Sequence, residues 1–190
     1  MIKILCEKNL HHAPPPVGGE HILQQGRETD AVKGLYKTLE DLVWLTQLGL
    51  NLLLPLVLAR KSYPEMARRL APIAQKLEIT NLLAKFPYEV SGGQKQRTAV
   101  ARALITSPKL VLADEPTGAL DSKSTGSLLR LFEQINAEGQ TILMVTHSAR
   151  AASHAGRVLF IKDGVVYHQL NRGTMSDEEL YQKITETLTV

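Results

Sequence analysis

Two adjacent carboxylates at the end of an apolar run are the side chains best suited to chemistry in this sequence. Residues 109–113 (Lys-Leu-Val-Leu-Ala) lead directly into Asp114 and Glu115. A strand that ends in acidic residues places them where parallel α/β sheets bind their ligands. There Asp114 can hold Mg²⁺, usually through water, and Glu115 can polarise an attacking water molecule. The simpler alternative is a solvated strand end with no chemical role.

A glycine pair in front of a predicted helix offers a second chemical site. Residues 91–94 (Ser-Gly-Gly-Gln) precede a polar, basic stretch at residues 95–97 (Lys-Gln-Arg). Glycines let a phosphate approach the backbone closely, and a helix N-terminus adds free N–H groups and a partial positive charge. The alternative is an ordinary helix cap with two loop glycines, because short glycine motifs are often unrelated to phosphate binding.

Asp121 and His147 complete the set of polar candidates. Asp121 follows Leu120 shortly after the carboxylates, and His147 stands just past the apolar run at residues 141–145. A lone histidine is usually structural or merely exposed. At the end of a second parallel strand, however, His147 would lie beside the carboxylate strand if the two strands are neighbours. That position favours a functional histidine.

Alternating strands and helices must position these residues. Apolar runs predict strands at residues 109–113, 141–145 and 158–162, and Gly164 then turns into residues 165–167 (Val-Val-Tyr). The first two runs are continuous rather than alternating. This pattern predicts strands that are covered on both faces of a parallel sheet.

Cap residues mark the helices between and after these strands. Helices are predicted at residues 93–106 and 122–137, with Ser122 as the cap of the second and Gly139 as its end. Residues 176–179 (Ser-Asp-Glu-Glu) open a last helix with acidic residues in its first turn.

The N-terminal half has a different character. Prolines and glycines at residues 11–19 interrupt any regular element, and Ile22-Leu23 with Gly26 predicts a short strand and turn. Residues 39–90 are predicted to be helical, with apolar side chains at helical spacing between residues 66 and 77.

Composition fits one soluble globular domain. The 190 residues are 44% hydrophobic and 22% charged, and the net charge of +3 comes from scattered lysines and arginines, so nucleic-acid binding is not expected. Cys6 is the only cysteine, which fits a reducing compartment. The N-terminus lacks the apolar core of a signal peptide, and the apolar stretch at residues 48–59 is shorter than the roughly 20 residues of a membrane span. A cytoplasmic protein is expected.

In order and spacing, the motifs resemble those of ABC transporter ATPases. Residues 91–94 are similar to the signature motif, 110–117 to Walker B, 120–121 to the D-loop and 146–147 to the H-loop. The resemblance covers residues 88–168 densely. It implies an α/β P-loop NTPase fold, in which a parallel sheet carries a helical subdomain.

The resemblance also implies a role for each motif. By analogy with the family, the nucleotide held by an opposite subunit is contacted by Ser91, Gly92, Gly93 and Gln94. Asp121 would link the two sites of such a dimer.

The remaining motif residues would act on MgATP bound to the same subunit. The resemblance makes Asp114 the carboxylate on the Mg²⁺ side, Glu115 the general base that activates water, and His147 a contact to the γ-phosphate. ATP and Mg²⁺ are therefore the expected cofactors.

Upstream the resemblance weakens. A P-loop needs the string G-x-x-x-x-G-K-[ST], which does not occur; the nearest stretch is residues 34–38, where Tyr36 replaces the glycine before the lysine. Residues 2–6 (Ile-Lys-Ile-Leu-Cys) look like the helix that follows the P-loop, and residues 16–27 like the next strand and turn. We therefore expect Met1 to lie a few residues past the missing lysine, and the fold to lack its N-terminal strands and P-loop.

The Q-loop glutamine of the family is expected near Lys37 or Thr38, and neither is Gln; Gln47 is closest but out of register. A sequence error, a frameshift or degeneration could each explain this. The leucine-rich stretch at residues 42–59 is expected either to form a groove for a permease helix or simply to pack on the helix at residues 66–77.

These observations predict a single partial ATPase domain over residues 1–190. Its expected parts are a helical subdomain at 39–100, a core with Walker B, D-loop and H-loop at 101–170, and a C-terminal helix at 171–190.

The expected function is that of an ATP-binding subunit that couples MgATP hydrolysis to a permease at the inner face of the cell membrane. Its partners would be a second ATPase subunit, as a homo- or heterodimer, and that permease. Residues 113–118 and the ending at 160–173 resemble bacitracin-, lantibiotic-, macrolide- and lipoprotein-type systems, which implies export of an antimicrobial peptide or lipid-like substrate. The alternative is an inactive remnant that presents only the signature and D-loop half-site. Without a P-loop, the chain alone is predicted to be inactive.

Overall fold

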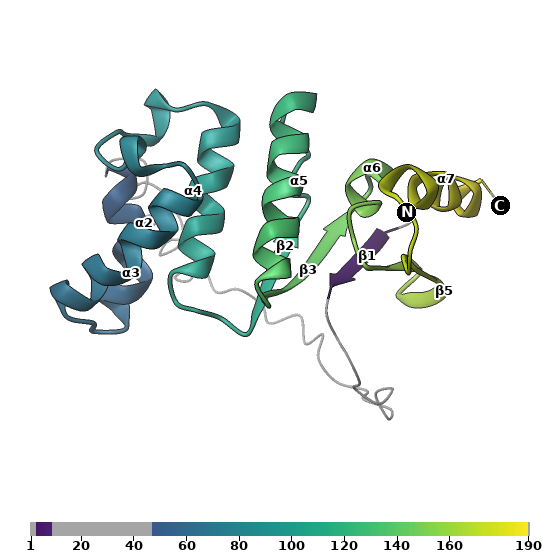
Figure 1. The fold of residues 1–190 in the computed structure, drawn as a ribbon, viewed down its shortest axis with the longest axis horizontal. Helices are drawn as coiled ribbons and strands as arrows, with labels where there is room; N and C mark the ends of the chain where they lie inside the picture. Colours follow the sequence, from purple (N-terminus) through teal and green to yellow (C-terminus); the bar gives the residue numbers. More distant parts are fainter. Residues whose placement is uncertain (1–2, 9–46, 190) are drawn as a thin grey trace, which may run out of the picture.

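The computed structural model describes residues 3–8 and 47–189 (Figure 1). Three helices gather at one end of the molecule, the sheet lies at the other, and helix α5 stands between them. The predicted strand and turn at residues 22–26 and the Q-loop positions Lys37 and Thr38 lie outside the described residues. Within the described ranges, no helix combines the length and the apolar character that crossing a membrane requires.

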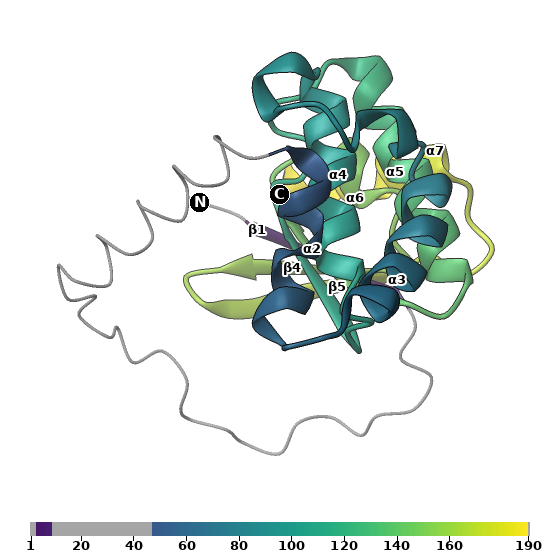
Figure 2. The same ribbon diagram turned by 90° about the vertical axis from the view of Figure 1, so that its left-hand side faces the viewer.

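The helical end is built from α2 (Leu48–Leu58), α3 (Tyr63–Lys76) and α4 (Gly92–Leu104), with 3₁₀ turns at Thr80–Leu82 and Pro87–Glu89. Figure 2 shows these three helices in front of the rest of the molecule. The sequence predicts that residues 39–90 are helical, and the described part of this range contains α2, α3 and the two 3₁₀ turns. The buried apolar residues that they share include Leu48, Leu52, Ala74, Leu77, Ile79 and Leu82.

Five strands form one sheet in the described residues, in the order β2-β3-β1-β4-β5. Strands β2 and β3 are parallel, as predicted, whereas β1 runs antiparallel to both β3 and β4, and β5 runs antiparallel to β4. The sheet is therefore mixed, with its parallel pair at the carboxylates. The strands are β1 (Lys3–Lys8), β2 (Leu110–Asp114), β3 (Thr141–Thr146), β4 (Arg157–Lys162) and β5 (Val165–Asn171).

Strand β1 corrects one expectation. The resemblance predicted a helix at residues 2–6, but Lys3–Lys8 is the central strand of the sheet, with Cys6 opposite both Met144 and Val158. Strands β3 and β4 each present a row of backbone N–H and C=O groups that must be paired when buried. As an extended strand, residues 3–8 pair with the backbone groups of both neighbours, and the β-branched Ile4 favours this conformation. A helix of only six residues would not be stable by itself.

The two faces of the sheet differ, which corrects a second expectation. On one face, Ile142 and Phe160 are buried beneath helices. On the other face, the side chains of Leu110 and Leu112 are 45% and 71% exposed in the described structure. The continuous apolar runs predicted cover on both faces, but the described helices cover only one.

The covering helices are α5 (Ser122–Ala137), α6 (Ala149–Ala152) and α7 (Asp177–Leu188). Gly139, with φ of +99°, follows the end of α5, as predicted. Ser176 caps α7, and its hydroxyl oxygen accepts a hydrogen bond from the backbone N–H of Glu179 at 3.2 Å, so the predicted start of this helix is confirmed. These helices share a buried apolar cluster with β2, β3 and β4, and this packing positions the polar residues at the strand ends.

Candidate functional site

The signature loop (residues 91–94) forms the N-terminus of α4. Ser91 is the cap residue, and its hydroxyl oxygen accepts a hydrogen bond from the Gln94 N–H at 3.3 Å. In return, the Ser91 N–H donates to the Gln94 side-chain oxygen at 2.9 Å. This reciprocal capping box satisfies two groups at the helix end, while the other N–H groups keep the partial positive charge of a helix N-terminus.

The signature loop packs tightly against the start of α5. A Cβ atom on Gly93 would lie only 3.0 Å from the hydroxyl oxygen of Ser124, and one on Gly92 would lie 3.5 Å from a methyl carbon of Leu120. Glycine at position 93 is therefore what allows the N-termini of α4 and α5 to approach each other. A surface pocket of about 410 Å³ opens beside both N-termini and is lined by residues from each.

Asp121, and not Ser122 as predicted, caps α5. Its backbone is extended (φ −66°, ψ 163°), and one carboxylate oxygen accepts a hydrogen bond from the Ser124 N–H at 2.9 Å. The Ser124 hydroxyl donates to the other oxygen at 2.7 Å. These two hydrogen bonds lower the pKa of Asp121, because they stabilise its charged form. A carboxylate accepts both bonds better than a hydroxyl, which explains the shift of the cap by one residue.

Asp114 and Glu115 end strand β2 next to strand β3. Asp114 pairs with Val145 in the parallel ladder and is exposed. The Glu115 N–H donates to the Val145 carbonyl at 2.8 Å, and its φ of +41° is unusual for a residue with a side chain. Such backbone conformations cost energy and cluster at functional sites.

The Glu115 carboxylate points back to the end of β3. Its Oε2 accepts a hydrogen bond from the buried Thr146 hydroxyl at 3.1 Å, and its Oε1 lies 3.6 Å from Nε2 of His147. The Thr146 hydroxyl also accepts the Ser148 N–H at 3.0 Å. Oε1 is shielded from solvent and has no hydrogen-bond partner among the described residues. An orphaned polar atom of this kind is what a water or a ligand satisfies.

The predicted residues thus fall into two groups. The first is the signature loop with Asp121, at the starts of two helices. The second consists of Asp114, Glu115 and His147 at the ends of two parallel strands; with Thr146, which was not among the predicted site residues, it is called here the carboxylate edge. A turn joins the groups, held by the Gly118 N–H, which donates to the Glu115 carbonyl at 3.1 Å.

Sequence reasoning missed two residues that organise these groups. Thr146 positions Glu115, and Ser124 holds Asp121 while it contacts Gly93. Both are small hydroxyl residues, whose type alone signals little. The position of Thr146 directly before His147, at the end of an apolar run, was the one available signal.

The residues present fit part of an MgATP site. Asp114 is an exposed carboxylate, a suitable oxygen ligand for Mg²⁺ or its waters, and the orphaned Oε1 of Glu115 lies at the same edge. The helix N-terminus at Ser91 suits a phosphate group.

Comparison with known proteins places the chain in a family. The family model described as ABC transporter matches residues 8–118, more than half of the chain. The ABC transporter ATP-binding protein YvcR of Bacillus subtilis is 50% identical over 141 residues, which are 74% of this chain and 54% of that protein. The bacitracin export ATP-binding protein BceA of Halalkalibacterium halodurans is 45% identical over 138 residues, 72% of this chain and 54% of that one.

Solved structures agree with this relationship. The dimeric structure of MJ0796, a bacterial ABC transporter cassette, matches with a TM-score of 0.58 and 35% sequence identity, over 67% of this chain and 57% of that one. The chain spans about half the length of the curated relatives that it matches. The motifs, the fold and these matches lead to one conclusion: this chain belongs to the ABC transporter family and carries part of its ATP-binding domain.

Proposed function

We propose that the chain functions within an ATP-binding subunit that couples MgATP hydrolysis to a membrane permease. In this proposal the signature loop and Asp121 complete a nucleotide site with a second subunit. The single observation that carries it is the contact between the starts of α4 and α5, where Gly93 and Ser124 bring the signature loop and the Asp121 cap to one surface pocket.

The carboxylate edge supports the hydrolytic part of the proposal. Asp114 would hold Mg²⁺ through water, and Glu115 would accept a proton from the attacking water through Oε1. His147, whose Nε2 lies 3.6 Å from that oxygen, would donate to the γ-phosphate. Bound Mg²⁺ would neutralise phosphate charge, and the residues of the chain orient water and hold the proton.

The proposed half-site, formed by the signature loop and Asp121, is also accessible to a second subunit. Ser91, Gly92 and Asp121 are all exposed, so the ends of both helices are open to a partner. Backbone N–H groups at a helix start offer anion binding without a charged side chain. A relative of this chain, MJ0796, has been described as a dimer and in a state bound to ADP and Pi.

The proposal also covers the substrate that the transporter exports and the side of the membrane on which the chain lies. The relatives named as bacitracin and macrolide export proteins favour an antimicrobial-peptide or lipid-like substrate. The chain would lie on the cytoplasmic side of the membrane, docked to its permease through the helical subdomain. We assign residues 39–100 to that subdomain, 101–170 to the catalytic core and 171–190 to a C-terminal segment that contains α7.

A second candidate is an interaction module that presents only its signature half-site. The signature loop and Asp121 line one pocket at the starts of two helices, and this arrangement favours a role in presenting that surface to a partner. A full-length homologous subunit with its own P-loop would then supply the nucleotide.

Mixing the chain with such a subunit tests the proposal. We expect a 1:1 complex that forms in MgATP and dissociates when nucleotide is removed, measured by light scattering after size exclusion. The same mixture with ADP serves as the control. Failure to associate in MgATP, although both chains are folded by circular dichroism, would refute the half-site.

A further inference from the structure

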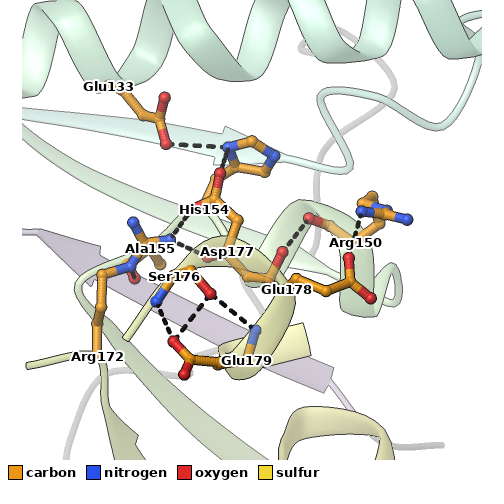
Figure 3. Close-up of polar contacts among 10 residues, drawn as sticks. Glu133, Arg150, His154, Ala155, Arg172, Ser176, Asp177, Glu178 and Glu179 are labelled. Atoms are coloured by element: carbon orange, nitrogen blue, oxygen red, sulfur yellow. Dashed lines mark hydrogen bonds and ion pairs between the residues drawn. The ribbon is translucent and has the colours of Figure 1, made fainter. Parts of the chain in front are cut away.

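Three potential metal ligands converge where α5, the segment after α6 and the start of α7 meet. Glu133 lies on α5, His154 follows α6, and Asp177 opens α7 (Figure 3). Nδ1 of His154 lies 2.9 Å from Oε1 of Glu133 and 3.5 Å from Oδ2 of Asp177. One ligand atom from each of the three residues lies within 4.8 Å of the other two.

This spacing matches a small divalent ion. With Zn–N and Zn–O bonds of about 2.0–2.2 Å, tetrahedral geometry sets neighbouring ligand atoms roughly 3.4 Å apart. The two distances from His154 bracket that value. An imidazole with two carboxylates suits Zn²⁺ and related transition metals, whereas Mg²⁺ prefers oxygen ligands alone.

The frame around the ligands is fixed by Arg172. Its guanidinium pairs with Oδ1 of Asp177, which directs Oδ2 toward His154, and its Nε donates to the Ala155 carbonyl at 3.1 Å. It also donates to the Ser153 carbonyl, so the backbone on both sides of His154 is held. A hydrogen bond to the second atom of a ligand is how proteins orient metal-binding side chains.

Burial and charge agree with an ion-binding site. The side chains of His154, Glu133 and Asp177 are 17%, 29% and 43% exposed, which leaves one open side for ion entry and a water ligand. Two carboxylates and the single guanidinium of Arg172 surround the imidazole, so these three charged groups sum to a net negative charge. Partial burial strengthens its attraction for a cation.

We propose that Glu133, His154 and Asp177 bind one divalent transition-metal ion of the Zn²⁺ class. In this site the imidazole of His154 would coordinate the ion through Nδ1 and carry its proton on Nε2, so that any proton on Nδ1 moves to Nε2 or is released to solvent. The bound ion would fasten α7 to α5 and to the segment after α6. This site shares no residue with the signature loop or the carboxylate edge.

Calorimetric titration of the 190-residue chain with ZnCl₂ tests the site directly. We expect one equivalent whose affinity falls by more than about tenfold in both His154→Ala and Glu133→Gln, since each removes a ligand. Two matched controls keep their affinity: His168→Ala, an exposed histidine on β5, and Glu178→Gln, an exposed acid that pairs with Arg150. Zn²⁺ also raises the melting temperature of the wild type and leaves that of His154→Ala unchanged.

Glu133→Gln preserves side-chain volume, so it keeps the test valid if His154→Ala does not fold. Co²⁺ loading supplies a second readout, because tetrahedral coordination gives visible absorption that the Glu133→Gln variant should lose. Equal Zn²⁺ affinity in wild type and Glu133→Gln would overturn the proposal. So would the absence of any bound Zn²⁺ in the folded wild-type chain.

Discussion

The signature loop and the carboxylate edge differ in how far the chain itself satisfies them. At the signature loop, Ser91 and Gln94 cap each other, and both oxygens of Asp121 accept hydrogen bonds from Ser124. At the carboxylate edge, Glu115 has a left-handed backbone and an Oε1 without a hydrogen-bond partner among the described residues. The first group is held in place by its own hydrogen bonds, as the proposed half-site requires, whereas the second stores backbone strain beside a carboxylate oxygen that a ligand or water could satisfy.

The two groups also differ in their surroundings. The signature loop begins α4 beside the start of α5, and a Cβ atom on Gly93 would lie 3.0 Å from the Ser124 hydroxyl oxygen. The carboxylate edge lies at the end of β2. On one face of this strand, the side chains of Leu110 and Leu112 are exposed in the described structure.

The largest effect is expected at the helix contact. In Gly93→Ala, the new methyl group would lie 3.0 Å from the Ser124 hydroxyl oxygen, so either that hydroxyl must leave its hydrogen bond to Asp121 or α4 and α5 must move apart. We expect MgATP-dependent association with a full-length homologous subunit to weaken by about tenfold or more, as overpacking costs about 1–3 kcal/mol. Analytical ultracentrifugation measures the loss.

Gly126→Ala is the matched control, because a Cβ there meets only a guanidinium nitrogen of Arg130 at 3.8 Å. It should associate like the wild type. Equal affinity of the two variants would show that the contact at Gly93 does not shape the half-site.

Thr146→Val tests the carboxylate edge. The substitution removes the buried hydroxyl that donates to Glu115 and accepts the Ser148 N–H, so two hydrogen bonds are lost. We expect the free energy of unfolding in urea to fall by about 1–2 kcal/mol. Thr146→Ser keeps the hydroxyl and should lose less; an equal or larger loss in Thr146→Ser would contradict the hydrogen-bonding role.

A smaller effect is expected from the charge of Asp121. Its lowered pKa means that the folded chain binds a proton less readily than the unfolded chain. The resulting stability is present above the ordinary aspartate value of 3.8 and is lost as the pH falls through the lower folded value. Asp121→Asn retains a capping side chain but cannot titrate.

Urea midpoints of wild type and Asp121→Asn should therefore differ more at pH 7 than at pH 3. Comparing the two proteins at each pH cancels contributions from other carboxylates, such as Glu179, whose pKa is also lowered by hydrogen bonds from Ser176. A difference that stays constant from pH 7 to pH 3 would contradict the role given to Asp121.

The smallest effect is expected on the open face of the sheet. Leu112→Thr should change the free energy of unfolding by less than about 0.5 kcal/mol, because its side chain is 71% exposed. Val111→Ala, on the covered face, should cost about 1–3 kcal/mol. If Leu112→Thr costs as much as Val111→Ala in urea unfolding, the two faces do not differ as described.

Much of the fold was predictable because its signals are local. Apolar runs bounded by Pro108 and Asp114 predicted β2, and the Ser176 cap with its acidic turn predicted α7. Strand β1 could not be predicted in the same way. Its six residues carry no local signal strong enough to decide, and its pairing with two distant strands determines its form.

The site was predictable from motif order but not in its supporting contacts. The spacing of Asp114, Glu115 and His147 predicted their meeting at one sheet edge. The hydrogen bond from Thr146 to Glu115 depends on side-chain orientation, which no spacing encodes. The cluster of Glu133, His154 and Asp177 escaped prediction because its members come from three elements far apart in sequence.

Mg²⁺-dependent ATP hydrolysis by the purified 190-residue chain alone tests the central contrast most directly. The account predicts no rate above the buffer background, because Glu115 and His147 cannot act on a phosphate that the chain does not hold. Wild type and Glu115→Gln should then be indistinguishable. A rate that persists through purification and disappears in Glu115→Gln would contradict the account, because the carboxylate edge would then be complete in this chain alone.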